Sequence, residues 1–464
     1  MADLDDLLTA TLADVSGLIE RREVSPVALV DAQLARIEAL DVRVGSYLLV
    51  TADLAREQAR RAAREIAGGR YRGRLHGIPL ALEDLVATRG IPTTCGSPML
   101  RGTRPGHDAA VVEKLAAAGA VCTGKLTLGE FALYAHHPDF RPPSNPWRED
   151  DPTGVSSSGA GAATAASLCF GAVGSDTGGS LRLAAATCGV VGLKPTFGKI
   201  SRHGAHPLAD TLDHLGTVTR GVSDAAILLA ALEGRDPRDP ATRRDPPVDY
   251  LAAIAGGASG LRIGIDRAYC AADTDPAQAD ATSRACFILK GQGIDIVDID
   301  LTGITDACAH WLATCAVDAL RRHRDSFPRR AAEYGPVFRA LLEYGLTVTA
   351  EDYARGQRTR QAVTGLLENA LRDVDCILCP ASPRPAMSRQ ACPSQQVAPL
   401  LRFSAPTDFS GHPSITVPNG FTADGLPTAM QFIGRLGDEA TILRIAGAYE
   451  RATGWHRRRP LLAP

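Results

Sequence analysis

The chain has 464 residues, of which 45% are hydrophobic and 22% are charged, and its formal net charge is −2. This balance is typical of a large globular protein, and it excludes binding to nucleic acid or to a membrane surface through bulk charge. The sequence has no apolar stretch of about 18 residues, the length of a transmembrane helix. The acidic N-terminal segment MADLDDLLTA lacks the basic region of a secretion signal, so we expect a cytoplasmic protein.

Helices are predicted for the first 70 residues. Ser25 followed by Pro26 is a typical helix start, with serine as the N-cap and proline in the first turn. Apolar residues then recur at helical spacing along one face. A second helix is expected over 53–67, where it ends before the glycine pair that begins at Gly68.

Strands and helices alternate along the rest of the chain, which predicts an α/β fold with a large sheet covered by helices. Helices are expected over 109–118, from a capping box at Thr349 and Asp352 to about residue 372, and from residue 439. Residues 234–248 are rich in proline and charged residues, and this composition predicts a surface loop within one domain. Strands are expected at 78–82, 120–124, 171–175, 261–265, 294–299, 376–379, 414–417 and 428–434.

The 11 cysteines follow no disulfide framework and are interpreted as mostly buried thiols. Cys376 and Cys379 form a CxxC pattern, which occurs in redox and metal sites, but the short apolar run ending at Pro380 favours a buried strand. His136 and His137 are adjacent, and adjacent residues rarely chelate one ion. We therefore expect no metal site, and no dinucleotide or P-loop motif indicates a cofactor.

Residues 151–196 carry the pattern most suggestive of chemistry. A serine run that begins at Ser156 precedes a segment rich in glycine and alanine, and Gly178, Gly179 and Ser180 follow a predicted strand. Glycines at such a point let backbone N–H groups converge and form an oxyanion hole. The serine is then a candidate nucleophile if a base reaches it. The same triplet also occurs in ordinary turns and linkers, so spacing alone leaves both interpretations open.

This segment resembles the signature of the amidase-signature enzymes, whose usual form reads GTDTGGSIR and later CGVVGLKPT. LHGIPLALED resembles the family's LHGIPVAVKD, and GHPSITVPNGF resembles its closing strands. The resemblance covers most of the chain and is weakest over 265–345, a region that helps to shape the substrate pocket in this family. It implies one domain over 1–464, with N-terminal helices in 1–70 and a substrate-shaping excursion over about 235–400. The implied fold is a large mixed twisted β-sheet core covered by helices on both faces.

The resemblance implies a Ser–Ser–Lys triad. The nucleophile would be Ser180, and Ser156 would be the bridging serine, which a cis peptide bond precedes in the family. Further implied site residues are Thr177, Gly178 and Gly179 as backbone donors of the oxyanion hole, and Asp176, Arg182 and Ser157 as supports.

Two residues depart from the family pattern within this machinery. The position of the catalytic lysine holds Glu83, and no shift of register restores a lysine, because Lys125 and Lys194 match other lysines of the family. Val155 stands where the family has glycine, directly before Ser156. A β-branched residue restricts the backbone at this point.

Glu83 changes what the site can do. An ionised carboxylate can accept a proton, but with a reference pKa of about 4.3 it is a weak base unless burial raises that value. A carboxylate at about 6 Å from an oxyanion also repels it by about 3 kcal/mol at an effective dielectric constant near 20. A substrate cation would pair with Glu83, so we expect a small-molecule substrate that carries an amine.

Three functions are compatible with these residues. The first is an amidase-type hydrolase or acyl transferase that uses Ser180, Ser156 and Glu83. The second is an amidase-fold enzyme repurposed for non-hydrolytic biosynthetic chemistry centred on Glu83. The third is a catalytically inactive partner subunit that resembles the amidase chain of a tRNA-dependent amidotransferase. Homodimers are common in the family, so the resemblance is also compatible with a homodimer.

Overall fold

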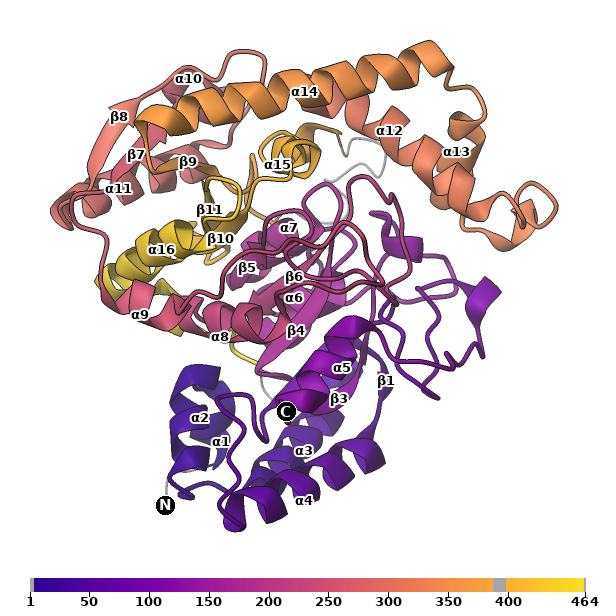
Figure 1. Cartoon of the computed structure of the whole chain (residues 1–464), viewed down its shortest axis with the longest axis vertical. Coiled ribbons are helices and arrows are strands. Elements are labelled where there is room, and N and C mark those ends of the chain that lie inside the picture. The colour runs from indigo at the N-terminus through magenta and orange to yellow at the C-terminus, as the bar shows by residue number, and fades with distance from the viewer. Residues whose placement is uncertain (1–3, 387–397, 463–464) are drawn as a thin grey trace.

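The computed structural model describes residues 4–386 and 398–462 (Figure 1). Its strands form one sheet of 11 strands in the order β1-β3-β2-β4-β6-β5-β10-β11-β9-β7-β8. The sheet is mixed, because β2 runs parallel to β3 and β4 while β4 runs antiparallel to β6. The strands are β1 Tyr47–Val50, β2 Pro79–Glu83, β3 Val121–Leu126, β4 Gly171–Asp176, β5 Val191–Lys194, β6 His214–Thr219, β7 Arg262–Ile265, β8 Asp295–Asp298, β9 Cys376–Pro380, β10 Ser414–Phe421 and β11 Pro427–Ile433.

Helices pack on both faces of this sheet. Ala172 and Val173 are neighbours on β4 and belong to two different hydrophobic clusters, as expected for side chains that alternate between faces. The described helices are α1 Leu4–Thr9, α2 Leu12–Glu20, α3 Pro26–Val44, α4 Ala52–Ala67, α5 Ala110–Ala117, α6 Ser158–Ala165, α7 Ser180–Cys188, α8 Val222–Leu232, α9 Tyr250–Ala255, α10 Arg267–Ala271, α11 Pro276–Gly291, α12 Asp306–His323, α13 Pro336–Gly345, α14 Ala350–Asp373, α15 Ala405–Ser410 and α16 Glu439–Thr453. The cluster of Ala172 includes residues of α6 and α7, whereas that of Val173 includes residues of α8. The predicted α/β fold is therefore confirmed.

Local sequence signals placed most of the elements correctly. The Ser25 side chain caps α3 by accepting a hydrogen bond from the N–H of Val27 at 3.3 Å. The capping box of Thr349 and Asp352 opens α14, and residues 234–248 form an irregular connection. Each predicted strand is present within two residues at its start. Three strands were not predicted, because β1 is a short edge strand and β5 and β6 lie within glycine-containing motif segments.

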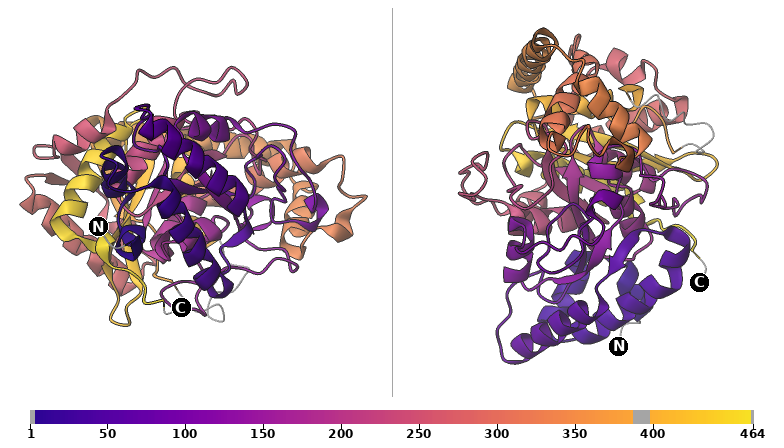
Figure 2. Two further views of the ribbon diagram at one scale, coloured as in Figure 1. Left: turned by 90° about the horizontal axis from the view of Figure 1, so that it is seen from below. Right: turned by 90° about the vertical axis from the view of Figure 1, so that its right-hand side faces the viewer.

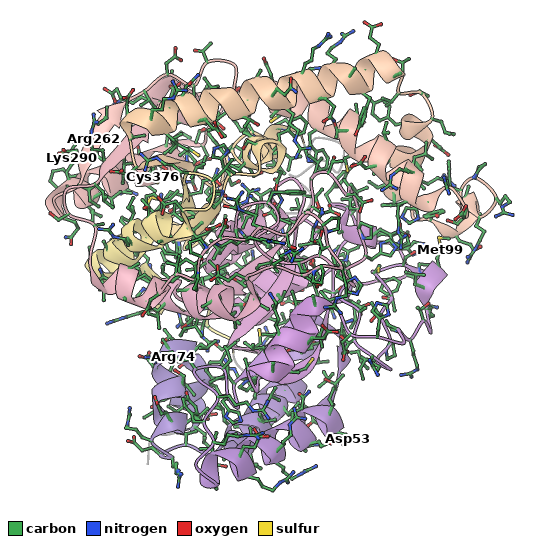
Figure 3. The ribbon with its side chains drawn as sticks, in the orientation of Figure 1. Asp53, Arg74, Met99, Arg262, Lys290 and Cys376 are labelled. Atoms are coloured by element: carbon green, nitrogen blue, oxygen red, sulfur yellow. The ribbon has the colours of Figure 1, made fainter. Side chains whose placement is uncertain are left out.

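The segment between β7 and β9 extends the same sheet rather than forming a separate one. β7 pairs in parallel with both β8 and β9, and β9 pairs with β11. In Figure 1 and in the right-hand view of Figure 2, α12, α13 and α14 lie at the opposite end of the molecule from α1–α4. Figure 3 shows Asp53 and Lys290 at the outside of the molecule, whereas Cys376 lies within it at the start of β9.

Among the described residues, no helix combines the length and the apolar composition that crossing a membrane would require.

Candidate active site

The site is built where the parallel strands β2 and β4 end side by side. Their register pairs Leu82 with Val173, so Glu83, the last residue of β2, lies beside the end of β4. Gly174 makes this approach possible, because a Cβ atom at that position would lie only 2.8 Å from Oε2 of Glu83. The carboxyl ends of adjacent parallel strands thus bring Glu83 next to the segment that leads to Ser180.

Ser180 and Ser156 form a hydrogen-bonded pair of hydroxyl groups. Ser180 is the first residue of α7, and Gly179 before it has φ of 129°, a conformation that favours glycine. Ser156 lies in the turn before α6 and is buried. The peptide bond between Val155 and Ser156 is trans, unlike the cis bond of the family pattern, and trans is the low-energy form for a bond that does not precede proline.

Glu83 is fully buried, and its carboxylate is anchored to Ser175, at the end of β4. Its Oε2 accepts hydrogen bonds from the backbone N–H of Ser175 at 2.6 Å and from the Ser175 hydroxyl at 3.1 Å. Its Oε1 is buried and has no hydrogen-bond partner among the described residues. Direct hydrogen bonds from Glu83 to Ser156 or Ser180 are absent in the same set of residues.

Burial raises the pKa of Glu83 to about 7. Hydrogen bonds from Ser175 and the nearby hydroxyl of Ser157 favour the ionised carboxylate and oppose this rise, and the nearby charge of Asp176 adds to it. A carboxyl group with this pKa exchanges its proton at neutral pH. Burial therefore makes Glu83 a stronger base than a free glutamate, with a strength that suits general acid–base chemistry.

Lysines elsewhere in the described chain do not take the place of the missing one. The ammonium of Lys125 donates to the carbonyl of Val86 and to the hydroxyl of Thr93, both at 2.8 Å, and pairs with Asp84 at 3.1 Å. The ammonium of Lys194 donates to a neighbouring backbone carbonyl at 3.2 Å. Glu83 is thus the titratable side chain that faces the serine cluster from β2.

The loop before Ser180 is held from several sides. The N–H of Gly179 donates to Oδ1 of Asp176 at 2.7 Å, so this amide already has an acceptor. The Thr177 hydroxyl donates to Asp213 at 2.7 Å. The amides of Thr177, Gly178 and Ser180 are the remaining candidates for contact with an oxyanion. No motif in the sequence indicated Asp213, although it begins a segment that resembles the family.

The predicted supports Asp176 and Arg182 form a buried ionic cluster beneath this loop. The Arg182 guanidinium lies 2.9 Å from Asp176 and 2.7 Å from Asp408, and all three side chains are fully buried. Burial alone would raise the pKa of Asp176, but the Arg182 charge outweighs it and holds this pKa below its usual range. The third predicted support, Ser157, donates its hydroxyl to the backbone carbonyl of Ser175 at 2.9 Å.

Two spaces with lining residues in common lie along the loop before Ser180. A narrow crevice of about 20 Å³ runs along Ser180 and is lined mainly by apolar side chains, among them Val155, Leu208 and Trp311. A larger cavity of about 190 Å³ has polar lining from Thr177, His206 and Asp213, and it shares Thr177 and Leu208 with the crevice. Trp311 lies in the weakly matched part of the sequence, where no motif pointed to it.

Comparison with known proteins shows the family of this chain. The sequence model of the Amidase family matches residues 28–443, which is most of the chain. The protein belongs to the amidase family. The chain is 40% identical to the putative amidase AmiD of Mycobacterium tuberculosis, over 99% of this chain and 97% of that protein. It is 38% identical to a glutamyl-tRNA(Gln) amidotransferase subunit of Roseiflexus sp. (strain RS-1), over 97% and 98% of the two chains.

Solved structures of the same family superpose on nearly all of the amidase. A bacterial aryl acylamidase of the amidase-signature family has a TM-score of 0.88 at 25% identity, covering 97% of this chain and 99% of its own. A glutamyl-tRNA(Gln) amidotransferase subunit from Thermotoga maritima has a TM-score of 0.84 at 30% identity, covering 100% and 98%. As a member of this family, the protein is an enzyme that acts on amide-type carbon–nitrogen bonds.

Proposed function

We propose that this amidase cleaves an amide through Ser180, with Ser156 relaying the proton and Glu83 acting as acid and base where the family has lysine. The observations that carry the proposal are the hydrogen-bonded pair of Ser156 and Ser180 hydroxyls and the buried carboxyl group of Glu83, which is bonded to Ser175 in the segment that leads to Ser180. The product acyl group passes to water in hydrolysis or to an amine in acyl transfer.

The proposed reaction has two halves. The Ser180 oxygen bonds to the carbonyl carbon while its proton passes to Ser156, and the Ser156 proton moves on to Glu83. Collapse of the tetrahedral intermediate breaks the carbon–nitrogen bond, and the leaving amine takes a proton back through Ser156. Water or an acceptor amine then attacks the acyl-enzyme by the reverse proton route and frees Ser180.

The unpartnered oxygen of Glu83 supports its part in this relay. Ser175 occupies Oε2, whereas Oε1, which has no partner among the described residues, keeps its lone pairs available for an arriving proton. One water molecule, or the hydroxyl of Ser157, would connect Oε1 with Ser156. Proton transfer also neutralises Glu83 as the oxyanion forms, and this removes the repulsion of about 3 kcal/mol that an ionised carboxylate would exert at about 6 Å.

A fluorophosphonate probe tests the nucleophile without knowledge of the natural substrate. The Ser180 oxygen would bond to phosphorus and displace fluoride, which intact-mass and peptide mass spectrometry detect. We expect labelling of the wild-type enzyme and of Ser201→Ala, a buried serine outside the site that bonds to Asp236. Ser180→Ala should not be labelled, and labelling that survives this substitution would overturn the assignment.

The same variants separate the alternative functions. If turnover is lost in Glu83→Gln and retained in Ser180→Ala, the site performs non-hydrolytic chemistry centred on Glu83. A partner subunit predicts no labelling of any variant together with a stoichiometric co-purifying protein. Relatives named as amidotransferase subunits support keeping this alternative in the test.

Three further features belong to the proposal. The substrate is a small molecule, and an amine on it would pair with ionised Glu83; a panel of neutral and amine-bearing amides tests this. Cytoplasmic location is tested by cell fractionation. A homodimer is tested by light scattering of the purified enzyme.

A further inference from the structure

Trp311 reaches the loop before Ser180 from a distant part of the chain. It lies on α12, and its indole N–H donates a 2.8 Å hydrogen bond to the backbone carbonyl of Thr177, 134 residues away in the sequence. The side chain is buried. Its ring packs directly on Gly178, where a Cβ atom would lie 2.8 Å from the nearest ring atom.

Because the peptide group is planar, the hydrogen bond to the Thr177 carbonyl also orients the N–H of Gly178. In a trans peptide the carbonyl of Thr177 and the N–H of Gly178 point in opposite directions and turn together. Because Trp311 holds the carbonyl, it also fixes the direction of the Gly178 amide. The next peptide is fixed separately, since the Ser404 hydroxyl donates to the Gly178 carbonyl at 2.6 Å and the Gly179 N–H is bonded to Asp176.

These contacts divide the loop amides into two groups. The Gly179 amide is directed at Asp176 and does not face a substrate. The Gly178 amide is directed away from Trp311, and it belongs to a residue that lines the crevice along Ser180. A donor of an oxyanion hole must already point at the reacting oxygen, because reorientation during the reaction costs energy.

We infer that Trp311 is a positioning residue of the oxyanion hole: its indole N–H holds the peptide that presents the Gly178 amide to the substrate's carbonyl oxygen. This inference rests on the proposed function, because it assumes attack by Ser180. The Trp311 ring also forms part of the apolar wall of the crevice together with Val155 and Leu208. The ring thus acts on substrate binding, whereas the N–H acts on the rate of the chemical step.

Trp311→Phe separates them, because phenylalanine keeps an aromatic wall and removes the N–H donor. We expect kcat for a small neutral anilide to fall about tenfold, the effect of losing one hydrogen bond that matters in the transition state, with KM little changed. Inhibition by a trifluoromethyl ketone, which forms a tetrahedral oxyanion on Ser180, should weaken by about the same factor.

Trp147→Phe is the matched control. The Trp147 indole N–H also donates to a backbone carbonyl, that of Cys188 at 2.7 Å, but at the opposite end of α7 from Ser180. Both variants lose the same type of bond, so a general loss of stability would appear in both. Only Trp311→Phe should lower kcat and weaken the ketone. Equal kinetics in the two variants would overturn the inference.

Failure of the proposed function and failure of the inference on Trp311 give different results. If Ser180→Ala retains activity, the proposed function fails, and the result for Trp311 no longer concerns an oxyanion hole. If Ser180→Ala is inactive and Trp311→Phe matches the wild type, the inference alone fails. Should Trp311→Phe not fold, site-specific incorporation of benzothienylalanine at position 311 replaces the N–H by sulfur and keeps the bicyclic ring.

Discussion

The backbone N–H of Ser175 donates a hydrogen bond of 2.6 Å to Oε2 of Glu83, between the ends of the adjacent strands β4 and β2. A carboxylate is an acceptor, whereas a protonated lysine at this position would place donor against donor. Glutamate at position 83 therefore supplies the acceptor that the Ser175 N–H requires, while its second oxygen, Oε1, has no partner among the described residues. A change at either residue should alter the acid–base behaviour of the site.

Glu83→Gln removes the proposed acid–base group and keeps an oxygen that can accept from Ser175. A base works only when ionised, so the wild-type rate of fluorophosphonate labelling should rise with pH through about 7, the pKa of Glu83, and then level off. In Glu83→Gln this rise should disappear, and the rate at pH 8 should fall about a hundredfold or more. Stopped labelling reactions from pH 5.5 to 9 measure both effects. An unchanged profile would exclude Glu83 as the base.

Ser175→Ala tests how the neighbouring hydroxyl tunes this base. The hydroxyl donates to Glu83 and favours the ionised carboxylate, so its removal should raise the pKa of Glu83 while the backbone N–H bond remains. The midpoint of the labelling profile should then move to higher pH. Ser201→Ala, whose hydroxyl bonds to Asp236, should leave the midpoint in place. A shift to lower pH would contradict the assigned direction of the hydrogen bond.

Glu83→Gln should also change the free energy of unfolding in a pH-dependent manner. The folded protein holds the Glu83 proton more tightly than the unfolded chain, because the pKa rises from 4.5 to about 7. The wild type therefore loses stability relative to the variant as pH rises from about 4.5 to 7, by about 3 kcal/mol in total, with little further change above. Urea unfolding at pH 4.5, 6 and 8 measures the difference, which should be smallest at pH 4.5.

Arg182→Met should destabilise the fold strongly. The substitution leaves the buried carboxylate of Asp176 without its cation and removes the hydrogen bond to Asp408, whose pKa burial and Asp176 raise, at a cost of about 3–5 kcal/mol. Arg355 pairs with Glu351 on the exposed surface of α14, so Arg355→Met should change stability by less than about 1 kcal/mol. Urea unfolding compares the two variants. Equal losses of stability in the two variants would mean that Asp176 and Asp408 form other hydrogen bonds or become protonated.

Glu83→Lys should redirect the substrate preference. The Ser156 and Ser180 hydroxyls are already paired as the family triad requires, so a lysine at 83 would complete that triad. We expect turnover of neutral amides to rise about tenfold or more, because a neutral lysine is a stronger proton acceptor than a carboxylate, and turnover of amine-bearing amides to fall, because the carboxylate that would pair with the amine is gone. Parallel assays of an anilide with and without a terminal amine measure this. A fall for both substrates would show that the surroundings of position 83 accept only the carboxylate.

Much of the site could be predicted because its parts lie at the ends of recognisable strands. The apolar runs over 78–82 and 171–175 indicated β2 and β4, and the family resemblance predicted that Glu83 and Ser180 belong to one site. The pairing of β2 with β4 in parallel then brings Glu83 near the segment leading to Ser180. The hydrophobic pattern predicted the two strands, because buried strands of an α/β sheet are apolar along their length, whereas their pairing is visible only in the folded chain.

The α/β fold and the family could be predicted from the order of the amino acids. Three features became visible only in the folded chain: Ser175 anchors Glu83, burial raises the pKa of Glu83 to about 7, and Trp311 holds the Thr177 carbonyl. Strand and cap signals act between neighbours in the chain, whereas burial and a hydrogen bond across 134 residues exist only once distant segments are packed together.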